Sequence, residues 1–149
     1  AGVLQIAAKE NIPTLIIEKE KFFTGNAYAD ELKEKQIDFI VLAGFLWKVP
    51  TALINAYPKK IINIHPALLP KYGGKGMYGH FVHEAVIANK EKESGITIHY
   101  ADELYDHGQI IFQTSFLLNE NETPETLAAR IHELEHLHFA KIIEQVVGG

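Results

Sequence analysis

The residues Asn63-Ile64-His65-Pro66 combine types and spacing that suit carbonyl chemistry. Side chains alternate between the two faces of a strand, so Asn63 and His65 should project together while Ile64 packs the other way. Pro66 should end the strand and leave the pair at its exposed end. An amide and an imidazole can both donate hydrogen bonds to an oxygen that becomes negative during attack on a carbonyl. For the triplet alone, a loop-capping Asn and a surface His are the commoner interpretation.

The segment DELYDHG, residues 102–108, supplies carboxylates that could act with His65. Asp106 is the candidate partner, because a nearby carboxylate favours the charged imidazole and fits it to act as an electrophile and acid. Asp is also common in turns ahead of a residue such as Gly108. Spacing does not decide among Asp102, Glu103 and Asp106.

Two further motifs are expected to have no chemical role. His132 to His136 reads H-E-x-x-H, as in zinc peptidases, but such a site needs a third ligand, and the chain offers none at the usual spacing. We therefore expect no metal. The glycines of GGKG, residues 73–76, lack the spacing of a phosphate-binding loop and indicate a mobile loop. A nicotinamide oxidoreductase is disfavoured, because no G-x-G-x-x-G follows a strand pattern.

Composition limits the classes of protein that the chain can represent. It has 149 residues with 47 % hydrophobic and 22 % charged residues, which suits one domain, and a net charge of −5, which argues against nucleic acid as a general partner. There is no cysteine for a disulfide or a thiolate metal site. No apolar run is long enough for a bilayer, so we expect no membrane partner and a cytoplasmic location. The first residues, AGVLQIAAKEN, resemble the inside of a helix, and we expect an N-terminal piece to be missing.

The elements that must position these side chains alternate between helical and strand patterns, which predicts an α/β fold with a mostly parallel sheet. Working groups of such folds gather beyond the carboxyl ends of the strands. The sequence predicts helices at 3–10, from Thr24 or Asn26 to Gln36, after Pro50, at about 77–89 and from Pro124 to about 147, and strands at 14–17, 37–44, 60–64, 95–101 and 109–118.

Taken together, these segments resemble the folate-dependent formyltransferases. VLAGF and HPALLPKY are typical of the whole family, and GITIHYADELYDHGQII and ARIHELEH extend the likeness to about Val147. KGMYGHFVHEAV and the one-domain length point to the branch that formylates glycinamide ribonucleotide. The resemblance implies a Rossmann-like three-layer fold over residues 1–149, N-terminally incomplete. It also implies transfer of the formyl group of 10-formyltetrahydrofolate to the amine of glycinamide ribonucleotide in purine biosynthesis.

The resemblance also assigns site residues by position. Asn63 and His65 match the family's oxyanion-binding pair, and Asp106 matches its catalytic aspartate. Pro66 and Glu135 should contact the ribonucleotide. The folate pterin should lie against the loop after VLAG and the loop around Asp106, at Leu42, Phe45, Trp47, Val49, Ala101, Asp102, Glu103, Leu104 and Tyr105.

This sequence departs from the family in two notable places. Trp47 stands where many relatives have Arg, and it is either a core aromatic residue or a side chain that covers the folate. The family's Gly/Ser-rich phosphate-binding turn does not precede Ala1, so we expect the chain as given to lack its phosphate site.

The alternatives within the enzyme class are another formyl acceptor, methionyl-tRNA or an amino sugar, and a formyltetrahydrofolate hydrolase. The tRNA enzymes usually continue into a basic second domain, and this chain is acidic. From another class, the chain could be an inactive folate-binding fragment. We expect small-molecule partners only, glycinamide ribonucleotide and formyl folate, and a monomer or homodimer.

Overall fold

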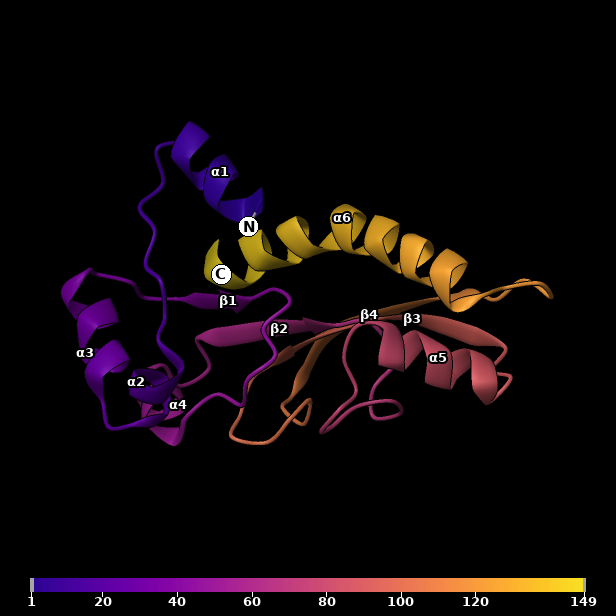
Figure 1. The fold of residues 1–149 in the computed structure, drawn as a ribbon, viewed down its shortest axis with the longest axis horizontal. Coiled ribbons are helices and arrows are strands. Elements are labelled where there is room, and N and C mark those ends of the chain that lie inside the picture. Colours follow the sequence, from indigo (N-terminus) through magenta and orange to yellow (C-terminus); the bar gives the residue numbers. More distant parts are fainter. Residues whose placement is uncertain (1, 149) are drawn as a thin grey trace.

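The computed structural model describes residues 2–148, which form a four-stranded sheet with helices packed on it (Figure 1). In chain order the elements are α1 (Gly2–Lys9), α2 (Lys19–Phe23), α3 (Ala27–Glu34), β1 (Ile40–Leu42), α4 (Thr51–Ala56), β2 (Ile61–His65), α5 (His80–Ala88), β3 (Glu93–Tyr100), β4 (Ile110–Leu117) and α6 (Pro124–Gly148). Nearly every predicted element is present, and the α/β class is confirmed.

The direction of the strands differs from the prediction of a mostly parallel sheet. The strand order is β1-β2-β3-β4; β1 and β2 are parallel, whereas β2–β3 and β3–β4 are antiparallel. The link between β3 and β4, residues 101–109, is shorter than the dozen or more residues that a parallel crossover requires. Burial patterns predict which segments are strands, and they do not specify strand direction.

The predicted strand at 14–17 is a second difference, since these residues lie outside any helix or strand. Leu15, Ile16 and Ile17 are between 40 % and 69 % exposed. A β-branched run forms a strand only where a neighbouring strand accepts its backbone hydrogen bonds. Within residues 2–148, none of the four strands pairs with this segment.

The alternation of side chains along β2 and β3 divides the centre of the sheet into an apolar and a polar face. Ile64 lies opposite Ile98 in the antiparallel register. Both belong to a buried core completed by Ile96, Val82 and Val86 of α5, and Leu127, Ile131 and Ile142 of α6. On the other face, Asn63 lies opposite His99 and His65 opposite Thr97. The apolar face therefore anchors the strands whose polar face carries the candidate chemistry.

A second core packs α2, α3 and α4 beside β1 and β2. Its buried members are Phe22, Tyr28, Ala29, Val49, Leu53, Tyr57 and Ile61. Phe45 and Trp47, in the loop after β1, pack against it. This core fixes the position of the loop that follows VLAG. Of the helices between residues 2 and 148, none combines the length and apolar character that a bilayer-spanning segment needs.

Candidate active site

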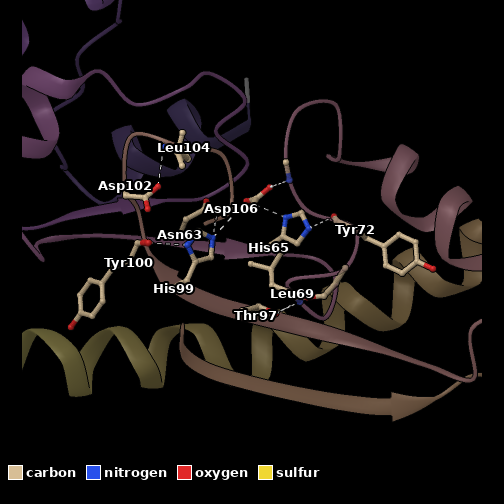
Figure 2. A network of polar contacts seen from close by, with 12 residues as sticks. Asn63, His65, Leu69, Tyr72, Thr97, His99, Tyr100, Asp102, Leu104 and Asp106 are labelled. Carbon is tan, nitrogen blue, oxygen red and sulfur yellow. Dashed lines mark hydrogen bonds and ion pairs between the residues drawn. The ribbon is translucent and has the colours of Figure 1, made fainter. Parts of the chain in front are cut away.

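Asn63, His65 and Asp106 come together at the end of β2 (Figure 2). His65 Nδ1 lies 3.4 Å from Asp106 Oδ1, and the two side chains are 3 % and 11 % exposed. Asn63 and His65 both line the main cleft, as alternation along the strand predicts. The three residues predicted as a catalytic group are thus neighbours in space.

Asp106 is distinguished from the other carboxylates of its loop by its partners. Asp102 accepts a hydrogen bond from the Leu104 N–H at 2.8 Å and pairs with His107, both within its own loop. Glu103 lies 3.4 Å from the Thr51 hydroxyl. The structure therefore resolves the choice that spacing left open, since Asp106 is the carboxylate that His65 faces.

The ring of His65 is held at both nitrogens. Nε2 lies 2.7 Å from the Tyr72 carbonyl oxygen, while Nδ1 faces the Asp106 carboxylate. Carbonyl and carboxylate oxygens only accept hydrogen bonds, so the protonated ring, which donates from both nitrogens, satisfies both contacts. The geometry is that of an imidazolium paired with a buried carboxylate.

The environment of Asp106 favours its ionised form. Burial by itself raises the pKa of the carboxyl group, but contacts with the ring nitrogens of His65 and His99, the charge of His65 and the Gly74 N–H hold that pKa well below its ordinary range. The Gly74 N–H donates to Asp106 Oδ2 at 3.2 Å. Asp106 thus remains an anion at neutral pH, with its carboxylate facing His65 Nδ1.

This lowered pKa predicts how stability depends on pH. An Asp whose folded pKa lies below its unfolded value of about 3.8 contributes stability above that value and loses the contribution as pH falls toward the folded pKa. We expect the difference in the free energy of unfolding between the unaltered protein and Asp106→Asn to be constant above about pH 5 and to shrink below about pH 4. Denaturant titrations of both proteins from pH 3 to 7 measure this difference in the free energy of unfolding. A difference that grows in acid would contradict the pairing.

The loop between β2 and α5, which contains GGKG, is held next to this group by hydrogen bonds and by a close approach at Gly73. The buried Thr97 hydroxyl donates to the Ala67 carbonyl at 2.7 Å and accepts from the Leu69 N–H at 3.1 Å. A Cβ on Gly73 would lie 3.2 Å from the Asp106 Cβ and 2.6 Å from Leu69 Cδ2. Because residue 73 is glycine, the loop can approach Asp106 closely and bring the Gly74 N–H to the Asp106 carboxylate.

Two hollows meet at the candidate catalytic group. The larger has a cavity volume of about 610 Å³ and is lined by Asn63, His65, Asp106 and the two predicted ribonucleotide contacts, Pro66 and Glu135. The smaller, about 50 Å³, is lined by eight of the nine predicted folate contacts: Leu42, Phe45, Trp47, Val49, Ala101, Asp102, Leu104 and Tyr105. Asn63 and Asp106 line both hollows. Glu103, the ninth, lines an adjoining groove with Leu104 and Val49.

Trp47 is half-buried within an aromatic cluster. Its ring lies 5.6 Å from that of Phe22, 5.8 Å from Phe23 and 5.9 Å from Phe45, measured between centroids. It also lines the smaller hollow. The two interpretations of Trp47 are compatible, because its ring packs against the second core and forms part of the wall of the hollow.

His132, in the His-rich middle of α6, lies beside the larger cleft. His132 lines that cleft and its Nδ1 is 3.1 Å from Glu135 Oε1. Among residues 2–148, no group of three or more His, Cys, Asp or Glu side chains is arranged to hold a metal ion. We expect the zinc content of the purified protein to be the same for the unaltered chain and for His132→Ala, measured by atomic emission. Loss of one zinc per chain in the variant would establish a metal site there.

Sequence analysis missed one residue of the group, His99. It is 2 % exposed, and its Nε2 lies 3.2 Å from Asn63 Nδ2. The available signal was a lone His in the apolar run GITIHYA, two residues after Thr97 and hence on the same strand face.

Comparison with known proteins is consistent with this geometry. Residues 1–143 match the family model described as formyl transferase. The chain belongs to the formyl transferase family. The phosphoribosylglycinamide formyltransferase of Bacillus subtilis (strain 168) is 36 % identical over 152 residues, an alignment that covers 99 % of this chain and 75 % of that protein. Within the family, the chain thus belongs to the phosphoribosylglycinamide formyltransferases.

Other members of this family differ in length and agree in fold. The chloroplastic phosphoribosylglycinamide formyltransferase of Arabidopsis thaliana is 40 % identical over 147 residues, covering 95 % of this chain and 50 % of the relative. The chain thus spans about half the length of that plant member of the formyl transferase family. The crystal structure of the phosphoribosylglycinamide formyltransferase from Bacillus halodurans superposes with a TM-score of 0.87 at 36 % identity, covering 99 % of this chain and 75 % of that one.

Proposed function

We propose that this member of the formyl transferase family transfers the formyl group of 10-formyltetrahydrofolate to the amine of glycinamide ribonucleotide. The observation that carries the proposal is the position of Asn63 and Asp106 on the shared border of two hollows, with His65 in the larger hollow facing Asp106. Two substrates that exchange a formyl group must meet at one carbonyl carbon, and this border is where such a carbon has donors and a carboxylate beside it.

The smaller hollow suits the folate. Its walls are mostly apolar and aromatic, with Leu42, Phe45, Trp47, Val49 and Leu104 among them, as a flat heterocyclic ring requires. The larger cleft suits the ribonucleotide, since its lining includes the carboxylate of Glu135, which can accept hydrogen bonds from ribose hydroxyls. The folate derivative acts as a substrate that donates one carbon.

The proposed reaction begins when the amine nitrogen attacks the formyl carbon. A carbon–nitrogen bond forms and the carbonyl electron pair moves to oxygen, which gives a tetrahedral oxyanion. Asn63 donates to this oxygen from its amide, and His65 donates from Nε2. Since the Tyr72 carbonyl accepts from that nitrogen at 2.7 Å, the oxyanion must replace the Tyr72 carbonyl. Donors aimed where charge develops lower the barrier, and the His65 donor becomes available when it exchanges the Tyr72 carbonyl for the oxyanion.

The proton on the attacking nitrogen must leave before the intermediate collapses. We assign its transfer to a water held by Asp106, which delivers a proton to N10 of the folate as the carbon–N10 bond breaks. The lowered pKa makes Asp106 a weak base, so its main contribution is to keep His65 charged and to orient that water. No metal and no covalent enzyme intermediate take part in this sequence. A cytoplasmic location and a monomeric or homodimeric state remain predictions from the sequence.

The experiment that tests the proposal follows the transferred carbon. The full-length protein is incubated with 10-formyltetrahydrofolate labelled with ¹³C in the formyl group and with unlabelled glycinamide ribonucleotide. We expect the label on the glycinamide nitrogen as a formamide, detected by NMR and mass spectrometry. Label released as formate would instead indicate hydrolysis.

The folate hollow gives a separate prediction for Leu104→Ala. Leu104 is 50 % exposed and lines the hollow. Its further burial by the bound ring is worth roughly 1.5 kcal/mol, which corresponds to an about tenfold higher KM for the formyl donor. The value of kcat should be unchanged, because the contact is the same in the ground and transition states. Leu137→Ala is the matched control, since Leu137 is 62 % exposed on α6 and lines neither hollow. Equal effects of both variants would remove Leu104 from the folate site.

A further inference from the structure

His99 is buried against the candidate catalytic group from the neighbouring strand. It lies on β3 opposite Asn63 in the antiparallel register and is 2 % exposed (Figure 2). Three groups surround the ring nitrogens of His99: the Asn63 amide, the Asp106 carboxylate and the carbonyl of the next residue, Tyr100. A fully buried imidazole with three polar neighbours has few hydrogen-bonding arrangements available, so its protons can be assigned.

The proton of the neutral ring lies on Nδ1. This nitrogen is 2.9 Å from the Tyr100 carbonyl oxygen, which can only accept a hydrogen bond. The other nitrogen, Nε2, then carries a lone pair and accepts from Asn63 Nδ2 at 3.2 Å. The strand backbone therefore determines the tautomer of His99, and the tautomer determines which end of the Asn63 amide faces the ring.

The two contacts at His99 Nε2 exclude each other. Asp106 Oδ1 lies 3.6 Å from the same nitrogen, farther than the Asn63 amide and farther than the 3.4 Å between Asp106 and His65 Nδ1. A proton on Nε2 would donate to Asp106, compete with His65 for the carboxylate, and turn the Asn63 amide so that its oxygen faced His99. With the lone pair on Nε2, Asp106 takes its imidazole donor from His65 alone.

We propose that His99 is a positioning residue whose Nδ1–H tautomer orients the Asn63 amide for the oxyanion and leaves Asp106 to pair with His65. One N–H of the Asn63 amide is fixed on His99 Nε2, and the second, about 120° away in the amide plane, stays available to the formyl oxygen. The inference rests on the proposed function, in which that second N–H meets the oxyanion. His99 also lines the smaller hollow, and the role proposed for it is exerted through Asn63 and Asp106.

The first test is spectroscopic and does not depend on activity. In ¹⁵N-labelled full-length protein, long-range ¹H–¹⁵N correlation spectra distinguish the two neutral tautomers and the imidazolium. We expect the His99 signals of the Nδ1–H tautomer, and we expect the Asn63 side-chain amide signals to shift in His99→Leu. A proton on Nε2 of His99, in either the other tautomer or the imidazolium, would overturn the proposal. So would an Asn63 amide that does not respond to the variant.

The second test separates orientation from structural support by kinetics. In His99→Leu we expect kcat to fall tenfold or more, below the hundredfold or greater loss for removing an oxyanion donor outright, with the KM of both substrates within about twofold. His99→Gln keeps an acceptor for Asn63 and should recover most of kcat. His136→Leu, an exposed residue of α6, is the matched control and should leave kcat unchanged.

A double-mutant cycle tests the route through Asn63. If His99 acts by orienting that amide, His99→Leu should cost little in an Asn63→Ala background, so the two losses are not additive. Additive losses, or a rise in KM in place of a fall in kcat, would overturn the proposal.

Thermal unfolding shows whether His99→Leu folds. If it does not, the tautomer of His99 in the unaltered protein and the kcat of His99→Gln test the proposal instead. Absence of any turnover in the unaltered protein would defeat the proposed function, whereas the tautomer and the Asn63 signals would still test the arrangement.

Discussion

Replacement of Asp106 by Asn should lower kcat at least about a hundredfold while the protein keeps its fold. The amide is nearly isosteric with the carboxylate but carries no charge. It can no longer support a protonated His65, whose Nδ1 lies 3.4 Å from Asp106 Oδ1. It also cannot relay a proton as an anion does. Steady-state release of tetrahydrofolate measures kcat, and circular dichroism checks the fold.

The matched control for this variant is Asp102→Asn in the same loop. Asp102 makes contacts with Leu104 and His107 and none with His65. We expect the kcat of Asp102→Asn to stay within a few-fold of the value for the unaltered protein. An effect of this variant should appear in the KM for formyl folate. Equal losses of kcat in both variants would mean that the loop as a whole, and not the Asp106 carboxylate, supports turnover.

Gly108→Ala should abolish activity and destabilise the fold. A Cβ at this position would lie 1.7 Å from the Tyr100 carbonyl oxygen and 2.7 Å from its carbon. Both are backbone atoms at the end of β3, so no side-chain rotation relieves the clash. The same carbonyl accepts the hydrogen bond of His99 Nδ1. The forced shift therefore reaches both the strand and the candidate catalytic group.

We expect the free energy of unfolding of this variant to fall by about 3 kcal/mol or more, at or above the upper end for inserting a methyl group into packed structure. Urea titration monitored by tryptophan fluorescence measures it. Gly2→Ala is the control, because a Cβ there meets nothing within 4 Å and Ala favours a helix. Unchanged stability and activity in Gly108→Ala would show that the 102–108 loop does not pack closely against the Tyr100 carbonyl.

Much of the candidate site could be predicted from local rules. Alternation along a strand places Asn63 and His65 on one side, and Pro66 marks the strand end. The resemblance identified Asp106 as their partner, whereas spacing alone left Asp102 and Glu103 as equal choices. The distinction depends on where residues 102–108 approach β2, and such long-range packing has no signature in the local sequence.

The features that the sequence did not predict correctly share a cause, because each depends on which strands pair in the folded protein. The β-branched residues 14–17 have strand character, but strand formation depends on a partner, and these residues are exposed here. The direction of β3 and β4 follows from the length and path of their connections. His99 became a member of the candidate group only through its register with Asn63, which sequence patterns do not specify.

The most direct test of the central claim measures tetrahydrofolate release from 10-formyltetrahydrofolate by the full-length protein. The candidate acceptors are glycinamide ribonucleotide, methionyl-tRNA, an amino sugar and water alone. We predict release that depends on glycinamide ribonucleotide and is lost in Asp106→Asn. Release with water or another acceptor would contradict the assignment of the substrate, and no release with any acceptor would contradict formyl transfer itself.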